Sequence, residues 1–222
     1  MSAFNDHMSQ HSFSQTKFRI KTALFVLLIL TSILFWVKSE YPNQQLLQHL
    51  GTLFVSLILI LDLKVNSLSI QAYVAVFLFI LLHIIGARWI YSYVPYQGFF
   101  EAIGIEIHEL LNINSERNHY DRFVHFSFGL LMIPFLYEIY LFRIQDKIIS
   151  LIFAWLTIQT FSMFYEVFEW LLTVVIPGEG ATDYNGQQGD VWDAQKDMAL
   201  AMLGSTFTAI IYFYREVYII LH

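Results

Sequence analysis

The stretch Leu68–Ile85, which reads LSIQAYVAVFLFILLHII, decides the fold class. It contains no Asp, Glu, Lys or Arg, and its length is close to the roughly 20 apolar residues that cross a hydrocarbon core about 30 Å thick. Comparable apolar runs lie on both sides of it, at Ile20–Val37, Leu46–Leu63, Phe123–Phe142, Ile148–Ile176 and Met198–Tyr214. The sequence therefore predicts an all-α membrane protein, a bundle of about six transmembrane helices.

The composition supports this fold class and excludes several functions. Hydrophobic residues make up 57% of the chain and charged residues 14%, unlike an ordinary soluble domain. The chain has no cysteine, which excludes disulfides and thiolate metal sites. No basic patch or glycine-rich phosphate loop is present, so we expect no nucleic-acid partner. The lipid bilayer is the first expected partner.

The N-terminal segment predicts the orientation. Residues 1–16 are rich in Ser, Gln, His and Asn without an apolar period, so we expect a flexible cytoplasmic tail before a membrane domain at 17–222. Lys17, Arg19 and Lys21 precede the first apolar run, and no clear small-residue cleavage site follows it. By the positive-inside rule, we predict that the first helix is retained and both termini are cytoplasmic.

In this topology, four of the predicted helices carry unusual polar residues near their outer ends. Asp121 and His125 are four residues apart, and Glu166 and Glu169 are three apart, so each pair lies on one helical face. Ionised groups within a bilayer are costly and usually face a partner or a cavity. The spacing therefore predicts a common polar site at the outer side.

The motif Gly189-Asp190-Val191-Trp192-Asp193-Ala194-Gln195-Lys196-Asp197-Met198 is the richest part of this site. Spacings of three and four predict that its three Asp residues share one face of the last helix. The candidate catalytic residues are His83, Asp121, His125, Glu166, Glu169, Asp190, Asp193 and Asp197. The candidate substrate-binding residues are Arg88, Arg122, Trp192 and Gln195. We expect Arg88, Arg122 and Lys196 to be the counter-ions.

These residue types suit a divalent metal, and the candidate ligands are His83, His125, Asp121 and Glu169. No compact HExxH signature is present, and an Asp–His pair four residues apart is also common as a plain hydrogen-bonded pair. A salt-bridge network that holds the helices together is the alternative.

Three functions remain open from the residues. The first is an enzyme acting at the outer side on a lipid-linked or other cell-envelope substrate, with an Arg holding a phosphate. The second is a structural or partner-binding membrane protein whose polar residues only order the bundle. The third is a proton-coupled or cation-coupled transporter, for which Glu138 is the candidate stepping-stone. The sequence sets neither the reaction nor the oligomeric state.

Two further patterns predict local structure. Apolar residues recur every three to four positions between Phe99 and Leu111, which predicts a short interfacial helix that could cover the site. Gly51, Gly129 and Gly204 lie within apolar runs, where small residues permit helices to approach closely.

The order of the motifs resembles the YjdF family of bacterial inner-membrane proteins. The matching motifs are His83-x-x-Gly86-Ala87, Arg117-Asn118-His119-Tyr120-Asp121-Arg122-x-x-His125, Tyr165-Glu166-x-x-Glu169-Trp170 and Gln188-Gly189-Asp190-x-Trp192-Asp193-x-Gln195-x-Asp197-Met198. The resemblance covers the third to sixth predicted helices. It implies a polytopic inner-membrane protein of about this size and no particular reaction.

A more distant likeness is to VanZ-like membrane proteins, which are tied to the cell envelope and to glycopeptide resistance. It rests on Asp121-Arg122-x-x-His125-Phe126, on Glu166, and on Asp197 followed by Leu203-Gly204. This chain has Met198 and Ala199 where that pattern has an Asn.

Overall fold

The computed structural model describes residues 2–106, 109–110, 117–175 and 186–221, with side chains from Ser14 to Val217 within these ranges. In this part of the chain the structure is all α-helical. The helices are α1 (Ser2–Trp36), α2 (Pro42–Val65), α3 (Ile70–Arg88), α4 (Tyr96–Glu101), α6 (Tyr120–Ile144), α7 (Lys147–Val175) and α9 (Asp193–Leu221).

All six predicted spans are confirmed, with shifted ends. The segments long and apolar enough to cross a membrane are Ser14–Trp36, Pro42–Val65, Ile70–Arg88, Tyr120–Ile144, Lys147–Val175 and Asp193–Val217. The last span begins at Asp193 rather than Met198, which puts two acids inside it. Ile176, the predicted end of the fifth span, lies outside the described residues.

One expectation for the acidic motif is wrong, because Asp190 does not share a helical face with Asp193 and Asp197. Asp190 precedes α9 in the preceding turn, where its Oδ1 accepts a hydrogen bond from the Trp192 N–H at 3.1 Å. A side-chain oxygen that binds a free N–H at a helix start acts as a cap and favours a position outside the helix.

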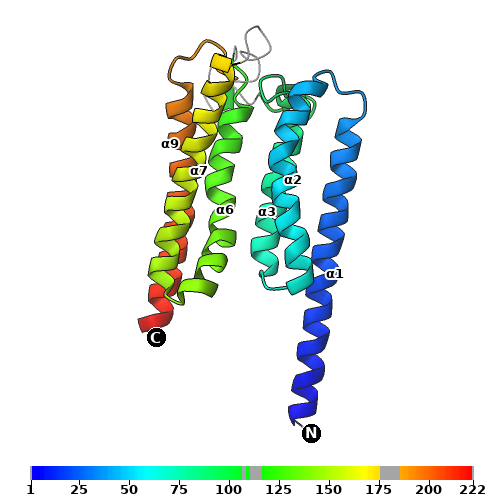
Figure 1. Cartoon of the computed structure of the whole chain (residues 1–222), viewed down its shortest axis with the longest axis vertical. Helices are drawn as coiled ribbons and strands as arrows, with labels where there is room; N and C mark the ends of the chain where they lie inside the picture. The colour runs from blue at the N-terminus through cyan, green and yellow to red at the C-terminus, as the bar shows by residue number, and fades with distance from the viewer. Residues whose placement is uncertain (1, 107–108, 111–116, 176–185, 222) are drawn as a thin grey trace.

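The N-terminal segment is helical. Helix α1 begins at Ser2 and therefore includes the residues expected to form a flexible cytoplasmic tail, whose flexibility and side of the membrane stay a prediction. Figure 1 shows this part projecting beyond the other helices. Once a spanning helix is nucleated, extending it adds one hydrogen bond per residue, so weak local preference is enough to continue it.

The spans form two groups of three, α1–α2–α3 and α6–α7–α9 (Figure 1). Within the described residues, α3 and α6 form the main contact between the groups. Both chain ends lie at one end of the bundle, and the α1–α2 turn, the end of α3, the start of α6, the end of α7 and the start of α9 lie at the other. We name the end with the termini the inner end and the opposite end the outer end, following the predicted orientation.

The second group packs closely because α6 and α9 meet at glycines. A Cβ at Gly129 would lie 2.0 Å from the Ala201 carbonyl oxygen, and a Cβ at Gly204 would lie 2.2 Å from that of Phe126. Small residues let two helix backbones approach in this way, as predicted. The same prediction does not hold for Gly51, since a Cβ there would meet nothing nearer than His83 Nε2 at 3.9 Å.

At the inner end, Asp62 is buried and fully partnered. Its Oδ2 lies 2.6 Å from the Nζ of Lys21, whose side chain is 0% exposed. Its Oδ1 accepts hydrogen bonds from the Leu68 N–H at 2.9 Å and the Ser67 hydroxyl at 3.1 Å. The pair therefore joins α1 to the α2–α3 turn.

Two more inner-end acids are fully partnered. Glu138 accepts from the Ser69 N–H at 2.7 Å and from the Ser69 hydroxyl at 2.5 Å. Glu216 Oε2 lies 2.7 Å from Lys147 Nζ, and its Oε1 lies 2.8 Å from an Arg215 nitrogen. Glu138 thus holds the start of α3 against α6, and its position is explained without a transport role.

The predicted interfacial helix corresponds in part to α4, which begins at Tyr96 and has six residues. Phe99 and Ile103 are 66% and 69% exposed. Residues 107–108 and 111–116 lie outside the described part, so a cover over the site stays a prediction.

Candidate functional site

The outer ends of α6, α7 and α9 bring buried ionisable side chains together. Helical spacing of three or four residues aims the two members from each helix at the same interior space. We call this group the outer cluster, and its members are Asp121, His125, Glu166, Glu169, Asp193 and Asp197, all at most 7% exposed. The predicted meeting of these three helices at one polar site is therefore present in the structure.

His125 lies at the centre of the cluster. Its Nε2 is 3.6 Å from Asp121 Oδ1 on the same helix and 3.4 Å from Glu166 Oε1 on α7. One ligand atom from each of Asp121, His125 and Asp197 lies within 4.8 Å of the other two. Three helices thus deliver a histidine and three carboxylates to one point.

Two arginines neutralise the part of the cluster nearest the loops. Arg117 pairs with Asp193 and donates to the Gln187 carbonyl at 2.6 Å. Arg122 lies 2.5 Å from Asp190 Oδ2 and 3.4 Å from Asp193 Oδ1. The expected counter-ion role of Arg122 is confirmed, and the pairs tie the start of α6 to the start of α9.

Asp190 is a partly exposed acid of this network, with its side chain 18% exposed. The hydrogen bond from Lys196, at 2.5 Å, and that from the Trp192 N–H lower the pKa of Asp190 to about 2. Because Asp190 stays ionised at any physiological pH, Lys196 acts as a counter-ion, as expected.

The deeper part of the cluster has no such compensation. Among the described residues, Asp197 Oδ1 and Glu166 Oε1 are buried without a hydrogen-bond partner. Asp197 is only 2% exposed. Buried polar atoms are nearly always satisfied, so an unpartnered carboxylate oxygen points to an ion, a water or a ligand.

His83 is engaged elsewhere. Its Nδ1 is hydrogen-bonded to the Tyr91 hydroxyl, and its Nε2 lies 3.0 Å from the Gln48 carbonyl oxygen. Both ring nitrogens are therefore occupied. The structure thus separates His83 from the outer cluster, although the sequence predicts that they share one site.

A sharp turn after α3 makes the His83–Tyr91 bond possible. Ile90 and Tyr91 have φ of 44° and 58°, a left-handed conformation that is costly for a β-branched residue. The turn lays the Tyr91 ring over Gly86, where a Cβ would lie 2.6 Å from Tyr91 Cε1. Gly86 is therefore required by this close approach.

A cavity of about 410 Å³ lies between the two helix groups, next to the outer cluster. Its polar lining is gathered towards the outer side, where Asp121, His125, His83, Tyr91 and Tyr165 contribute. Below them the walls are almost entirely apolar. Cavities of this size with a few convergent polar groups are typical ligand sites.

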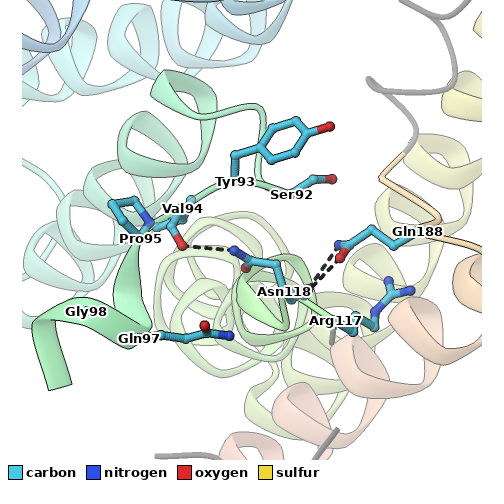
Figure 2. A pocket seen from close by; sticks show the side chains of 9 residues that line it. All are labelled: Ser92, Tyr93, Val94, Pro95, Gln97, Gly98, Arg117, Asn118 and Gln188. Atoms are coloured by element: carbon cyan, nitrogen blue, oxygen red, sulfur yellow. Dashed lines mark hydrogen bonds between the residues drawn. The ribbon is translucent and has the colours of Figure 1, made fainter. Parts of the chain in front are cut away.

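A second, more polar pocket of about 510 Å³ opens at the outer surface (Figure 2). In Figure 2, Asn118 lies between the Ser92–Gln97 segment and Gln188. Asn118 donates to the Val94 carbonyl at 2.9 Å, and its backbone N–H donates to Gln188 Oε1 at 2.8 Å. These bonds fix the walls of the pocket.

Gly186 lies next to both the outer pocket and the outer cluster. Its φ is +64°, and a Cβ there would lie 3.4 Å from Asp121 Oδ2 and 3.5 Å from the Ser92 hydroxyl oxygen. Ser92 lines the outer pocket and Asp121 lines the inner cavity. Gly186 thus lies beside one residue that lines the outer pocket and one that lines the cavity between the helix groups.

Three predicted substrate-binding residues lie away from the cluster. Arg88 donates to the Lys38 carbonyl at 2.8 Å, on the side of α1. Trp192 is 62% exposed and Gln195 is also exposed. Since Asp193 and Asp197 face inward, Gln195, two residues from each, faces the opposite side of α9. Arg122 alone of the four predicted residues contacts cluster members.

Arg117 and Tyr91 are important residues that the sequence reasoning missed. Arg117 lies in a loop, so no helical periodicity predicts which way its side chain points. Its position just before the helix that contains Asp121 is the signal that could have identified it. Tyr91 lies beyond the end of α3. Only the left-handed turn brings it to His83.

Comparison with known proteins identifies the family of this chain. The profile of the family described as "Predicted membrane protein (DUF2238)" matches residues 20–217. The chain belongs to this family. It is also 32% identical, over 141 residues, to the protein named "Inner membrane protein YjdF" from Escherichia coli (strain K12). That match covers 62% of the chain and 62% of the relative's length. No solved structure matches the chain.

Proposed function

We propose that this multi-pass membrane protein is an enzyme that acts on a lipid-linked or other cell-envelope substrate at its outer end. The membrane is the bacterial inner membrane in this proposal, with both termini cytoplasmic. The inner-membrane relative and the basic residues before the first span support that placement.

One observation carries the proposal. His125 lies buried within 3.4 to 3.6 Å of two carboxylates, beside an Asp197 oxygen that lacks a partner among the described residues. A histidine oriented by carboxylates can accept a proton from water or from a substrate hydroxyl, which typically contributes a factor of about 10²–10⁴ in rate. The adjoining cavity gives an apolar substrate access to this histidine.

A divalent metal fits the same residues. Asp121, His125 and Asp197 offer one imidazole and two carboxylates at a mutual spacing suited to one ion. A cation there would compensate the excess of buried acids and satisfy Asp197. Of the four ligands predicted from the sequence, this set keeps Asp121 and His125 and replaces His83 and Glu169 by Asp197.

The enzymatic function is tested in cells without knowing the substrate. Wild type and His125→Asn are produced at equal membrane levels, and envelope lipids are compared by mass spectrometry. An enzyme changes the abundance of at least one lipid species, and the variant does not. Identical lipid profiles for wild type, variant and an empty-vector strain contradict the proposal.

Metal binding is tested on purified protein. We expect stoichiometric zinc, manganese or magnesium by elemental analysis, lost after chelation, and stabilisation when the ion is returned. A ligand at 100 times its Kd stabilises by about 2.7 kcal/mol. Asp197→Asn should abolish both effects, whereas Glu138→Gln, at the inner end, should not. No bound metal and no stabilisation remove the metal from the proposal.

The alternative is a structural cluster, and the pairs Arg117–Asp193 and Arg122–Asp190 favour it for that part of the site. Removing one partner of a buried pair strands the other charge. Asp193→Asn should therefore destabilise the protein, whereas Glu169→Gln and His125→Asn should leave its melting temperature nearly unchanged. Equal destabilisation by all three favours the structural alternative.

A further inference from the structure

The apolar cavity between the helix groups has the chemistry of a hydrocarbon site. Its walls come from α2, α3, α6 and α7, and include Val55, Ile80, Phe128, Met132, Phe135 and Ile139. Lipid chains are as apolar as these side chains, so a chain can occupy the space without cost to either. Water in such a space finds almost no partners.

The cavity is also elongated along the membrane normal. On α6 its lining runs from Asp121 to Ile139. At 1.5 Å per residue this is about 27 Å. A hydrocarbon core is roughly 30 Å thick, so the cavity follows most of the membrane's depth. A lipid chain in it would lie parallel to the chains of the surrounding bilayer.

The cavity meets the bilayer between α2 and α7. Phe54 on α2 and Phe161 on α7 line it and are 61% and 54% exposed. Helix α2 packs mainly on α3 and α1, and α7 on α6 and α9. Near the outer end, the Tyr165 hydroxyl on α7 donates a hydrogen bond to Gln48 Oε1 on α2 at 3.4 Å and so connects these two helices. Below that contact the rim is apolar and faces lipid.

The cavity has one polar end and one apolar end, as a lipid molecule does. Polar groups are gathered at the outer end, where Asp121 and His125 of the outer cluster contribute, and the deeper lining is hydrocarbon-like. Gly186 lies beside Asp121 at this polar end and beside Ser92, which lines the outer pocket together with Arg117 and Asn118.

We infer that this cavity binds one hydrocarbon chain of a membrane lipid, admitted sideways between α2 and α7, with the lipid's polar end at the outer cluster. The identification of this lipid as the substrate rests on the proposed function. The binding of its chain does not, because it needs no turnover.

The test uses purified full-length protein in nanodiscs of phosphatidylglycerol that include a phosphatidylglycerol with a diazirine in its acyl chain. After illumination, the labelled residues are mapped by mass spectrometry. Met132 and Phe135 line the cavity and are only 7% and 4% exposed, so surrounding lipid reaches them poorly. Phe142 is 74% exposed and reports that surrounding lipid.

We expect labelling of Met132 and Phe135 alongside Phe142. Val55→Trp fills the cavity and should reduce labelling of Met132 and Phe135 about tenfold without changing Phe142. Leu57→Trp is the matched control, since Leu57 lies on the same helix, is 52% exposed and does not line the cavity. If Val55→Trp does not fold, the wild-type ratio of Met132 to Phe142 labelling decides.

Labelling confined to Phe142 and other exposed residues overturns the inference, as does undiminished Met132 labelling in folded Val55→Trp. His125→Asn separates the two proposals. This variant should keep the labelling of Met132 and Phe135, and it should abolish the change in lipid abundance expected in cells. Cavity labelling in wild type without any such lipid change leaves the chain site standing and removes the enzyme.

Discussion

The inner and outer ends of the bundle both contain buried acidic side chains, but the two ends differ in how completely these side chains are hydrogen-bonded. At the inner end, both carboxylate oxygens of Asp62, Glu138 and Glu216 have partners. At the outer end, Asp197 and Glu166 each keep a buried oxygen without a hydrogen-bond partner in the described part of the chain, although that of Glu166 lies 3.4 Å from His125 Nε2. A buried charge is tolerated when paired and costly when not.

This difference indicates two uses of the same residue type. The inner acids hold helices and turns in place, because each one is matched to specific donors. The outer cluster contains a paired part, around Arg117 and Asp193, and an uncompensated part, around His125 and Asp197. Structural need explains the paired part. The uncompensated part is the one that needs another explanation.

The largest expected effect is at the inner end. Asp62→Asn leaves Lys21 buried without its counter-ion, and breaking a buried pair costs roughly 3–5 kcal/mol. Unfolding by SDS titration in detergent micelles measures this loss. The double variant Lys21→Met with Asp62→Asn should recover most of it, because no unpaired charge remains and the Asn side-chain oxygen can still accept from the Leu68 N–H. A single variant as stable as wild type would show that the inner pair does not hold the helices.

A smaller loss is expected for Arg117→Gln, which tests the paired part of the outer cluster. It removes a partner of Asp193, but Arg122 stays 3.4 Å away, so we expect about 1–3 kcal/mol. The same unfolding measurement applies, with Arg88→Gln as the control, since Arg88 donates to the exposed carbonyl of Lys38. Equal effects of the two variants would mean that Arg117 has no special structural role.

The sharpest test of the comparison is Asp197→Asn, the same substitution as Asp62→Asn at the other end. Asp197 Oδ1 has no hydrogen-bond partner among the described residues, and the substitution removes one acid from a crowded group, so stability should change by less than about 1 kcal/mol. A loss as large as that of Asp62→Asn, in metal-free protein, would abolish the distinction between the two ends.

The smallest effect is expected at partly exposed Asp190, where the pH dependence can be worked out. Its pKa is lowered from 3.8 to about 2, so its pairing stabilises the folded state above about pH 4 and is lost as the pH falls through about 2. The difference in Tm between wild type and Asp190→Asn should be constant near pH 6 and vanish towards pH 2. A difference that persists at pH 2 would have another origin. Added salt should shrink it, as for any exposed pair.

The sequence predicted the spans well because hydrophobic length alone determines them. It also predicted that His125, Glu166 and Asp197 meet. Helical spacing determines which residues share one face of a helix, and the succession of membrane crossings determines on which side of the membrane each helix end lies. The family match is consistent with that pattern.

The remaining parts of the site depend on geometry that spacing does not encode. Asp190 leaves the helix because it caps it, and Tyr91 reaches His83 because two residues adopt positive φ. Arg117 acts from a loop. The sequence analysis placed His83 in the outer cluster because His83 and the cluster lie at the same depth in the membrane. Depth alone does not determine which way a side chain points.

The contact between α3 and α6 has a practical consequence. Phe79 and Phe128 meet there, with ring centroids 5.2 Å apart, and both border the lipid-facing cavity. This pair is one of the contacts that hold the two helix groups together. A smaller ring at either position would widen the cavity beside it and leave the ionisable groups of the outer cluster unchanged.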